Sequence, residues 1–221
     1  MKLAIQEAPL PKYIAVEGPI GVGKTTLANK LAETFNYDVL LEQPSENPFL
    51  ESFYKNPGQS ALAAQLFFLF QRMQQIQDLK QRSLFEPVRV ADFVIEKDRL
   101  FAEVNLSKEE MQLYDKVYDH LTIDAPTPDL VIYLQAPVDV LLDRINRRGN
   151  PNEKYLTTDY LEKLNEAYSK FFLYYESAPL LIVNAAGINL HDSESDYEML
   201  VDNIMSNPKG KNFLNPQPSI L

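Results

Sequence analysis

The sequence contains no cysteine among its 221 residues. A chain without thiols forms no disulfide, no thiolate metal site and no cysteine nucleophile. The absence fits a reducing compartment, and we expect the protein to be cytoplasmic.

The sequence also lacks long apolar runs. No stretch approaches the length that crosses a bilayer, and the segment from Met1 to Lys12 has no apolar core of the kind found in signal peptides. We therefore expect no membrane partner.

Positive charge is in short supply. The chain has 21 Lys and Arg against 31 Asp and Glu, which gives a net charge of −10. Proteins that coat nucleic acids need a basic face, so we expect no nucleic-acid partner. Any phosphate ligand must be held by cations gathered locally.

One glycine-rich stretch carries a phosphate-binding signature. Gly18-Pro-Ile-Gly-Val-Gly-Lys-Thr25 fits G-x-x-x-x-G-K-[ST], between an apolar segment at 13–17 and a helical pattern from Thr26. Glycines let backbone N–H groups converge on phosphates at a helix N-terminus. Lys24 would reach the β- and γ-phosphates and Thr25 would bind Mg²⁺, whereas the alternative is a chance glycine-rich turn. The residues expected to bind ATP here are Gly18, Gly21, Val22, Gly23, Lys24, Thr25 and Thr26.

Apolar strand patterns alternate with helical patterns along the rest of the chain. The expected strands are 13–17, 39–41, 88–93, 129–134 and 180–183. This order predicts a doubly wound, five-stranded parallel sheet with helices on both faces. We expect one α/β domain at 12–206, an N-terminal extension at 1–11 and a flexible tail at 207–221. Ligands of such sheets bind beyond the carboxyl ends of the strands.

Two acidic residues end predicted strands on that edge. Glu42 follows 39–41, and Asp92 lies at the end of 88–93. Phosphoryl transfer needs an oriented acceptor hydroxyl and a metal ion, so one carboxylate is a candidate proton acceptor and the other a candidate Mg²⁺ ligand. The alternative is that both residues cap turns.

Basic residues close the helix predicted at 138–148. Arg144, Arg147 and Arg148 precede Gly149 and Asn150, and Arg144 and Arg148 share a face. This pattern indicates a cationic flap over phosphates. A helix C-terminus also favours cations for its dipole, which is the simpler explanation.

The helix predicted at 60–84 carries Gln65 and Arg72 seven residues apart, on one face. A glutamine can present a donor and an acceptor together, as a nucleobase edge requires. A solvated helix face is the alternative.

Taken together, these motifs resemble those of the deoxynucleoside kinases. The shared segments appear in the family's order and span about residues 12–185. Beyond those above, they are Glu42-Gln-Pro with Asn47-Pro-Phe-Leu, Asp98-Arg-Leu-Phe-Ala102, Pro128 to Pro137, and Tyr160-Leu-Glu-Lys-Leu164. The resemblance implies a P-loop kinase fold with an Arg-rich lid at about 144–157, and a homodimer packed through helices near 60–84 and 107–120.

The resemblance also implies roles for single residues. Glu42 matches the general base at the 5′-hydroxyl, and Asp92 matches a residue near Mg²⁺ and the phosphates. The remaining matches are Tyr54 and Glu153 at the 3′-hydroxyl, Gln65, Arg72 and Asp98 at the base, Phe101 stacked on the base, and Arg144 and Arg148 in the lid.

The chain departs from the family pattern at three positions. Asp92-Phe93-Val94 lacks the arginine of the family's Glu-Arg-Ser or Asp-Arg-Ser motif, Asn150 replaces a lid arginine, and Ala64 stands where some relatives have phenylalanine. Loss of a cation at the phosphates weakens transition-state stabilisation. Arg147 and Arg99 are the candidate replacements.

The expected reaction is ATP-dependent phosphorylation of a deoxynucleoside, with a purine deoxynucleoside or deoxycytidine favoured. One alternative is a thymidylate-type nucleoside monophosphate kinase, although such an enzyme needs no carboxylate base. The other is a regulatory protein that binds ATP without turnover, which only the missing arginine favours.

Overall fold

The computed structural model describes residues 10–82, 89–122, 124–190 and 193–215. The strands are β1 (Tyr13–Glu17), β2 (Asp38–Leu40), β3 (Arg89–Ala91), β4 (Leu130–Gln135), β5 (Leu180–Asn184) and β6 (Lys211–Leu214). The α-helices are α1 (Lys24–Phe35), α2 (Leu50–Lys55), α3 (Pro57–Arg82), α4 (Lys97–Asn105), α5 (Lys108–Thr122), α6 (Val138–Arg148), α7 (Thr158–Leu173) and α8 (Glu194–Met205). Two 3₁₀ turns complete the described elements, η1 (Pro44–Glu46) and η2 (Pro151–Tyr155).

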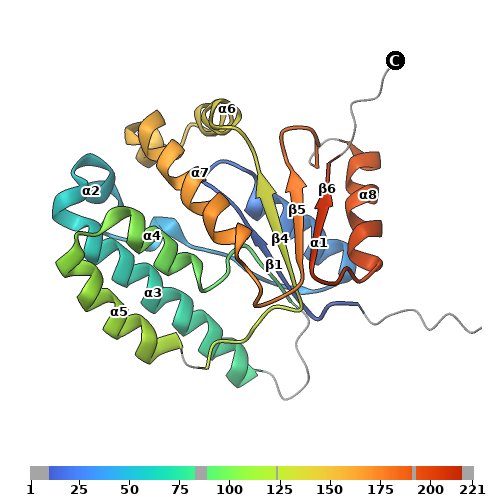
Figure 1. The fold of residues 1–221 in the computed structure, drawn as a ribbon, viewed down its shortest axis with the longest axis horizontal. Helices are drawn as coiled ribbons and strands as arrows, with labels where there is room; N and C mark the ends of the chain where they lie inside the picture. Colours follow the sequence, from blue (N-terminus) through green and yellow to red (C-terminus); the bar gives the residue numbers. More distant parts are fainter. Residues whose placement is uncertain (1–9, 83–88, 123, 191–192, 216–221) are drawn as a thin grey trace, which may run out of the picture.

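The strands form one parallel sheet in the order β2-β3-β1-β4-β5-β6 (Figure 1). The predicted parallel α/β architecture is confirmed, but the sheet has six strands where we expected five. The additional strand, β6, pairs with β5 and comes from the segment that we expected to be a flexible tail. Residues 216–221 of that tail and residues 1–9 of the expected extension lie outside the described part of the chain.

Both faces of the central strands are buried. In β1, Ile14 and Val16 belong to the core cluster that contains side chains of α1 and α8, whereas Ala15 belongs to the cluster that contains side chains of α7. Successive residues of a strand point to opposite faces, so helices must cover both sides. Near-continuous apolar segments such as Leu130–Leu134 follow from this double burial.

A further core lies beside the sheet, where α3, α4 and α5 pack together (Figure 1). Leu69 and Met73 of α3 and Ala102 of α4 share this cluster with Tyr114 of α5. Side chains of α3 and α4 extend from this cluster toward the carboxyl ends of β1, β2 and β3. The arrangement places polar residues of two helices opposite the loop between β1 and α1.

Candidate active site

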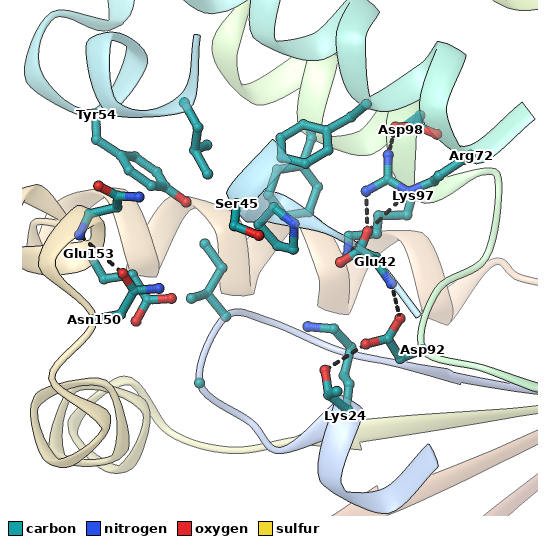
Figure 2. Close-up of a pocket in the computed structure, with 18 of the residues that line it drawn as sticks. Lys24, Glu42, Ser45, Tyr54, Arg72, Asp92, Lys97, Asp98, Asn150 and Glu153 are labelled. Carbon is teal, nitrogen blue, oxygen red and sulfur yellow. Dashed lines mark hydrogen bonds and ion pairs between the residues drawn. The ribbon is translucent and has the colours of Figure 1, made fainter. Parts of the chain in front are cut away.

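A cleft of about 300 Å³ lies at the carboxyl ends of β1, β2 and β3 (Figure 2). It gathers side chains from segments far apart in the sequence, as the parallel sheet requires. The sequence-predicted residues that line it are Gly21, Lys24, Thr25, Glu42, Tyr54, Gln65, Arg72, Asp92, Asp98, Phe101, Arg148 and Glu153.

The loop between β1 and α1 needs its glycines for close approach as well as for conformation. A Cβ on Gly18 would lie 2.5 Å from the carbonyl oxygen of Leu134, and one on Gly21 would lie 2.8 Å from Ile145 Cγ1. Both glycines also have positive φ angles, of 153° and 86°. We call residues 18–23 the glycine loop.

Lys24 begins α1 directly after the glycine loop. Its Nζ donates hydrogen bonds to the carbonyl oxygens of Gly18 at 2.8 Å and Pro19 at 3.3 Å. Burial, and next the nearby charge of Lys97, lower the pKa of Lys24 to about 8. The ammonium is thus held at the loop that anions would occupy.

Asp92 connects three segments at the edge of the sheet. Its Oδ2 accepts a hydrogen bond from Thr25 Oγ1 at 2.5 Å, and its Oδ1 accepts one from the backbone N–H of Glu42 at 2.8 Å (Figure 2). A hydroxyl and a carboxylate are the hard oxygen ligands that Mg²⁺ takes, usually together with several waters. Thr25 and Asp92 therefore fit a Mg²⁺ site, although the described residues contain no group of three or more His, Cys, Asp or Glu that could hold a metal.

Glu42 is held by two cations. Arg72 donates to its Oε1 through Nε at 3.0 Å and also through Nη2. Lys97 Nζ contacts Oε1 at 2.9 Å and Oε2 at 2.8 Å. Burial would raise the pKa of Glu42, but Arg72, Lys97 and Lys24 outweigh it and hold that pKa well below its ordinary range. Glu42 is a carboxylate at neutral pH.

Arg72 also pairs with Asp98 through Nη1. Asp98 is buried, and its Oδ2 has no hydrogen-bond partner among the described residues. Burial raises the pKa of Asp98 to about 7, while Arg72 keeps it from rising further. Gln65 is buried in the same cleft, so the cleft contains polar groups able to donate and accept.

Tyr54, Arg148 and Glu153 lie across the cleft. Arg148 donates to Glu153 through Nη2 at 2.8 Å and through Nε at 3.1 Å. Burial raises the pKa of Tyr54, so its hydroxyl stays protonated and can donate. Figure 2 shows Tyr54 and Glu153 on the side of the cleft opposite Glu42 and Arg72.

A second cleft of about 620 Å³ lies between the glycine loop, α6 and the end of β5. Gly21 and Arg148 line both clefts, which therefore meet at the glycine loop. Arg144 donates to the carbonyl oxygens of Val22 at 3.0 Å and Ala185 at 2.8 Å. The sequence-predicted residues along this second cleft are Gly21, Val22, Gly23, Thr26, Arg144, Arg147 and Arg148.

Neither candidate replacement for the missing arginine lies at the cleft around Glu42. Arg147 pairs with Asp143 on the exposed side of α6, and Arg99 pairs with Glu103 and Asp115. Arg147 nevertheless lines the second cleft beside Arg144 and Arg148, so it stays a candidate there, whereas Arg99 lines neither of the two clefts.

Sequence reasoning missed two buried charges in this site. Glu17 ends β1 and accepts hydrogen bonds from the backbone N–H of Gly18 at 2.8 Å, from that of Val94 at 3.0 Å and from Tyr168 Oη at 2.9 Å. The other missed residue is Lys97. The sequence does contain a signal for Glu17, because a glutamate at the end of an apolar strand must have polar partners when it is buried.

Comparison with known proteins identifies the class. Residues 14–207 match the deoxynucleoside kinase family. The chain is 42% identical to the deoxyguanosine kinase of Bacillus subtilis (strain 168) over 158 residues, 71% of this chain and 76% of the relative. It is 29% identical to the deoxyadenosine/deoxycytidine kinase of the same organism over 214 residues, 91% of this chain and 96% of the relative.

Solved structures agree with this assignment. The deoxyadenosine kinase from M. mycoides with bound dATP superposes with a TM-score of 0.74 at 25% identity, over 87% of this chain and 98% of the other. The chain therefore belongs to the deoxynucleoside kinase family. It is an enzyme, a kinase that phosphorylates deoxynucleosides. This excludes the alternative of a regulatory protein without turnover.

No described helix is both long enough and apolar enough to cross a membrane.

The pairing of Arg72 predicts a pH-dependent loss of stability. Arg72→Met leaves the buried Asp98 without its cation and Glu42 with Lys97 alone, and we expect the free energy of unfolding to fall by about 3–5 kcal/mol at pH 7. Without Arg72 the pKa values of Glu42 and Asp98 rise, because this cation lowers both in the native protein. A carboxyl whose pKa is raised by folding opposes folding more as pH rises, so the loss should be larger at pH 8 than at pH 5.

Urea unfolding at both pH values measures this effect. Arg99→Met is the control, because Arg99 is exposed and pairs outside the cleft with the exposed Glu103 and the half-buried Asp115, so its loss should cost no more than about 0.5 kcal/mol. Equal losses in the two variants would contradict the prediction.

Proposed function

We propose that this enzyme transfers the γ-phosphoryl group of ATP to the 5′-hydroxyl of a deoxynucleoside. The observation that carries the proposal is the pair of joined clefts. One contains a carboxylate, a buried glutamine and aromatic side chains, and the other runs along the glycine loop and α6. A donor and an acceptor bound in the two clefts would meet at Lys24 and Glu42.

On this proposal the glycine loop is a phosphate-binding loop. Its backbone N–H groups and the start of α1 hold the phosphates, and Lys24 exchanges its carbonyl partners for phosphate oxygens. Thr25 and Asp92 would hold Mg²⁺, which neutralises charge on the phosphates when bound. Arg148, at the junction of the clefts, and Arg144 belong to a lid at about 144–157.

Glu42 acts as the general base. The 5′-hydroxyl donates its proton to Glu42, its oxygen forms the new bond to the γ-phosphorus, and the bond from that phosphorus to the bridging oxygen breaks. The products are the deoxynucleoside 5′-monophosphate and ADP. Of the two carboxylate oxygens, Oε2 has Lys97 as its only hydrogen-bond donor among the described residues, which supports Oε2 as the atom that receives the proton.

The acceptor side of the cleft supports a purine deoxynucleoside or deoxycytidine. Gln65 presents a donor and an acceptor, and the unpartnered Oδ2 of Asp98 can accept from an exocyclic amine. Phe101 offers a ring face, and Tyr54 with Glu153 would hold the 3′-hydroxyl. The names of the relatives, deoxyguanosine kinase and deoxyadenosine/deoxycytidine kinase, point to the same substrates.

A substrate panel tests the proposed reaction. ADP release is measured with ATP and Mg²⁺ against deoxyadenosine, deoxyguanosine, deoxycytidine, thymidine, the ribonucleosides and thymidine monophosphate. We expect turnover on a purine deoxynucleoside, and loss of that turnover in Lys24→Ala with an unchanged circular dichroism spectrum. Turnover on thymidine monophosphate alone would move the assignment to a thymidylate-type kinase, and turnover on no compound would refute the proposal.

The base has its own test. Glu42→Gln keeps the side-chain shape but cannot take up the proton, so we expect kcat to fall by about 10²-fold or more. Glu103→Gln, an exposed position on α4, should leave kcat unchanged. A near-normal rate for Glu42→Gln would shift the role to Asp92.

We also propose that the enzyme is a homodimer packed through α3 and α5. Phe70 on α3 is 52% exposed and Leu113 on α5 is 51% exposed, so both helices present apolar side chains to solvent. Burial of such side chains favours association.

Analytical ultracentrifugation tests the dimer. The native chain should sediment as a dimer and Phe70→Glu as a monomer, because a charge would be buried without a partner. Phe213→Glu is the matched control, since Phe213 lies on β6 and is 72% exposed. A native chain that sediments only as a monomer would refute this proposal.

A further inference from the structure

Lys97 is a buried cation for which the sequence predicted no role. It is the first residue of α4, and its side chain is only 5% exposed. Its Nζ contacts both carboxylate oxygens of Glu42 (Figure 2). The same atom lies 3.8 Å from Glu17 Oε1. A buried ammonium is retained only where carboxylates offset its desolvation.

Phe93 explains why this cation is needed. It stands where the family motif has an arginine, and its fully buried ring packs in the cluster of α3, α4 and α5. The guanidinium of Arg72 lies 5.5 Å from the centre of that ring. The segment after β3 thus contributes packing where the family pattern has a cation, while Arg99 pairs with Glu103 and Asp115 and Arg147 lines the second cleft.

We propose that Lys97 takes the place of the missing arginine, as the residue that positions Glu42 and supplies positive charge beside the reacting groups. This inference rests on the proposed function. Lys97 reaches the site from the start of α4, four residues after Phe93, so the charge enters from a different backbone position.

The contacts of Glu42 show what Lys97 adds. Arg72 donates to Oε1 alone, whereas Lys97 contacts both oxygens. Lys97 therefore fixes the direction of Oε2, the oxygen that we assign to the hydroxyl proton. An ammonium has three N–H groups, so a third donor remains beyond the two used on Glu42.

Lys97 stays charged in this setting. Burial would lower its pKa, but Glu17 and Glu42 outweigh burial and raise it. The charged groups that act on it are Glu17 on β1, Lys24 on α1, Glu42 after β2, Arg72 on α3 and Asp98 on α4. Asp92 lines the same cleft, and Tyr168 on α7 donates to Glu17.

The first test is Lys97→Met, with kcat and KM measured on the best substrate of the panel. We expect kcat to fall by about 10²–10³-fold, as when one fixed donor is removed from a charged transition state. Lys163→Met, at an exposed site on α7, should change neither quantity.

A chemical rescue separates this role from a structural one. The native chain has no cysteine, so Lys97→Cys introduces a single thiol. Alkylation with 2-bromoethylamine forms a C–S bond, releases bromide and restores a side-chain amine of lysine length. We expect this product to recover at least tenfold in kcat over Lys97→Cys, whereas the neutral product from iodoacetamide should recover nothing.

Activity of the native enzyme alone tests the proposed function, so failure of that function is distinguishable from failure of this inference. If the native enzyme is active, a kcat for Lys97→Met within threefold of native would overturn the inference. Absence of recovery after aminoethylation would overturn it too. If Lys97→Met does not fold, the two alkylated forms of Lys97→Cys still decide the question.

Discussion

Burial of charge at the carboxyl ends of the strands is the constraint on which this structure depends. Carboxylates and cations alternate there, from Glu17 through Lys97, Glu42 and Arg72 to Asp98. An unpaired charge in such a place would cost several kcal/mol, so every member must keep its neighbours within reach. These ion pairs therefore hold the ends of β1 and β2 against α3 and α4, so the charged network of the site also connects elements of the fold.

Glu17 extends this charged network to the glycine loop. It accepts hydrogen bonds from the first residue of that loop and from the segment after β3, and Tyr168 on α7 secures it from the opposite side. The loop that we assign to phosphates is thus anchored to the same network that holds the candidate base. Positions of the two reacting groups are coupled through one buried side chain, which favours a site that is already organised before substrates bind.

The sequence was sufficient to predict the alternation of strands and helices, because doubly buried strands such as β4 read as continuous apolar runs. It could not predict β6. That strand has four residues, of which Leu214 alone is buried, and its segment is rich in Pro and Asn. Its only strand signal is its pairing with β5, which is a tertiary contact absent from any local pattern.

The residues of the candidate site also divide into those that the sequence could predict and those that it could not. Residues within contiguous motifs, such as Lys24, Glu42 and Asp92, were found from their spacing relative to strands. Lys97 was missed because a lone lysine beside Asp98 is unremarkable in sequence. Its meaning appears only when α4 brings it onto Glu42, and Phe93, which the sequence showed as a loss, proves to be a core residue.

The position of Lys24 has a consequence for energetics. In the native protein its ammonium rests on two carbonyl groups of the glycine loop, and burial holds its pKa near 8. On our proposal, phosphate oxygens replace those carbonyls and stabilise the charged form far more strongly. Near pH 8, Lys24 is neutral in a fraction of the molecules, so nucleotide binding at this pH takes up protons from the buffer. The glycine loop then acts as a proton-coupled anion receptor, whose affinity declines as the solution becomes more alkaline.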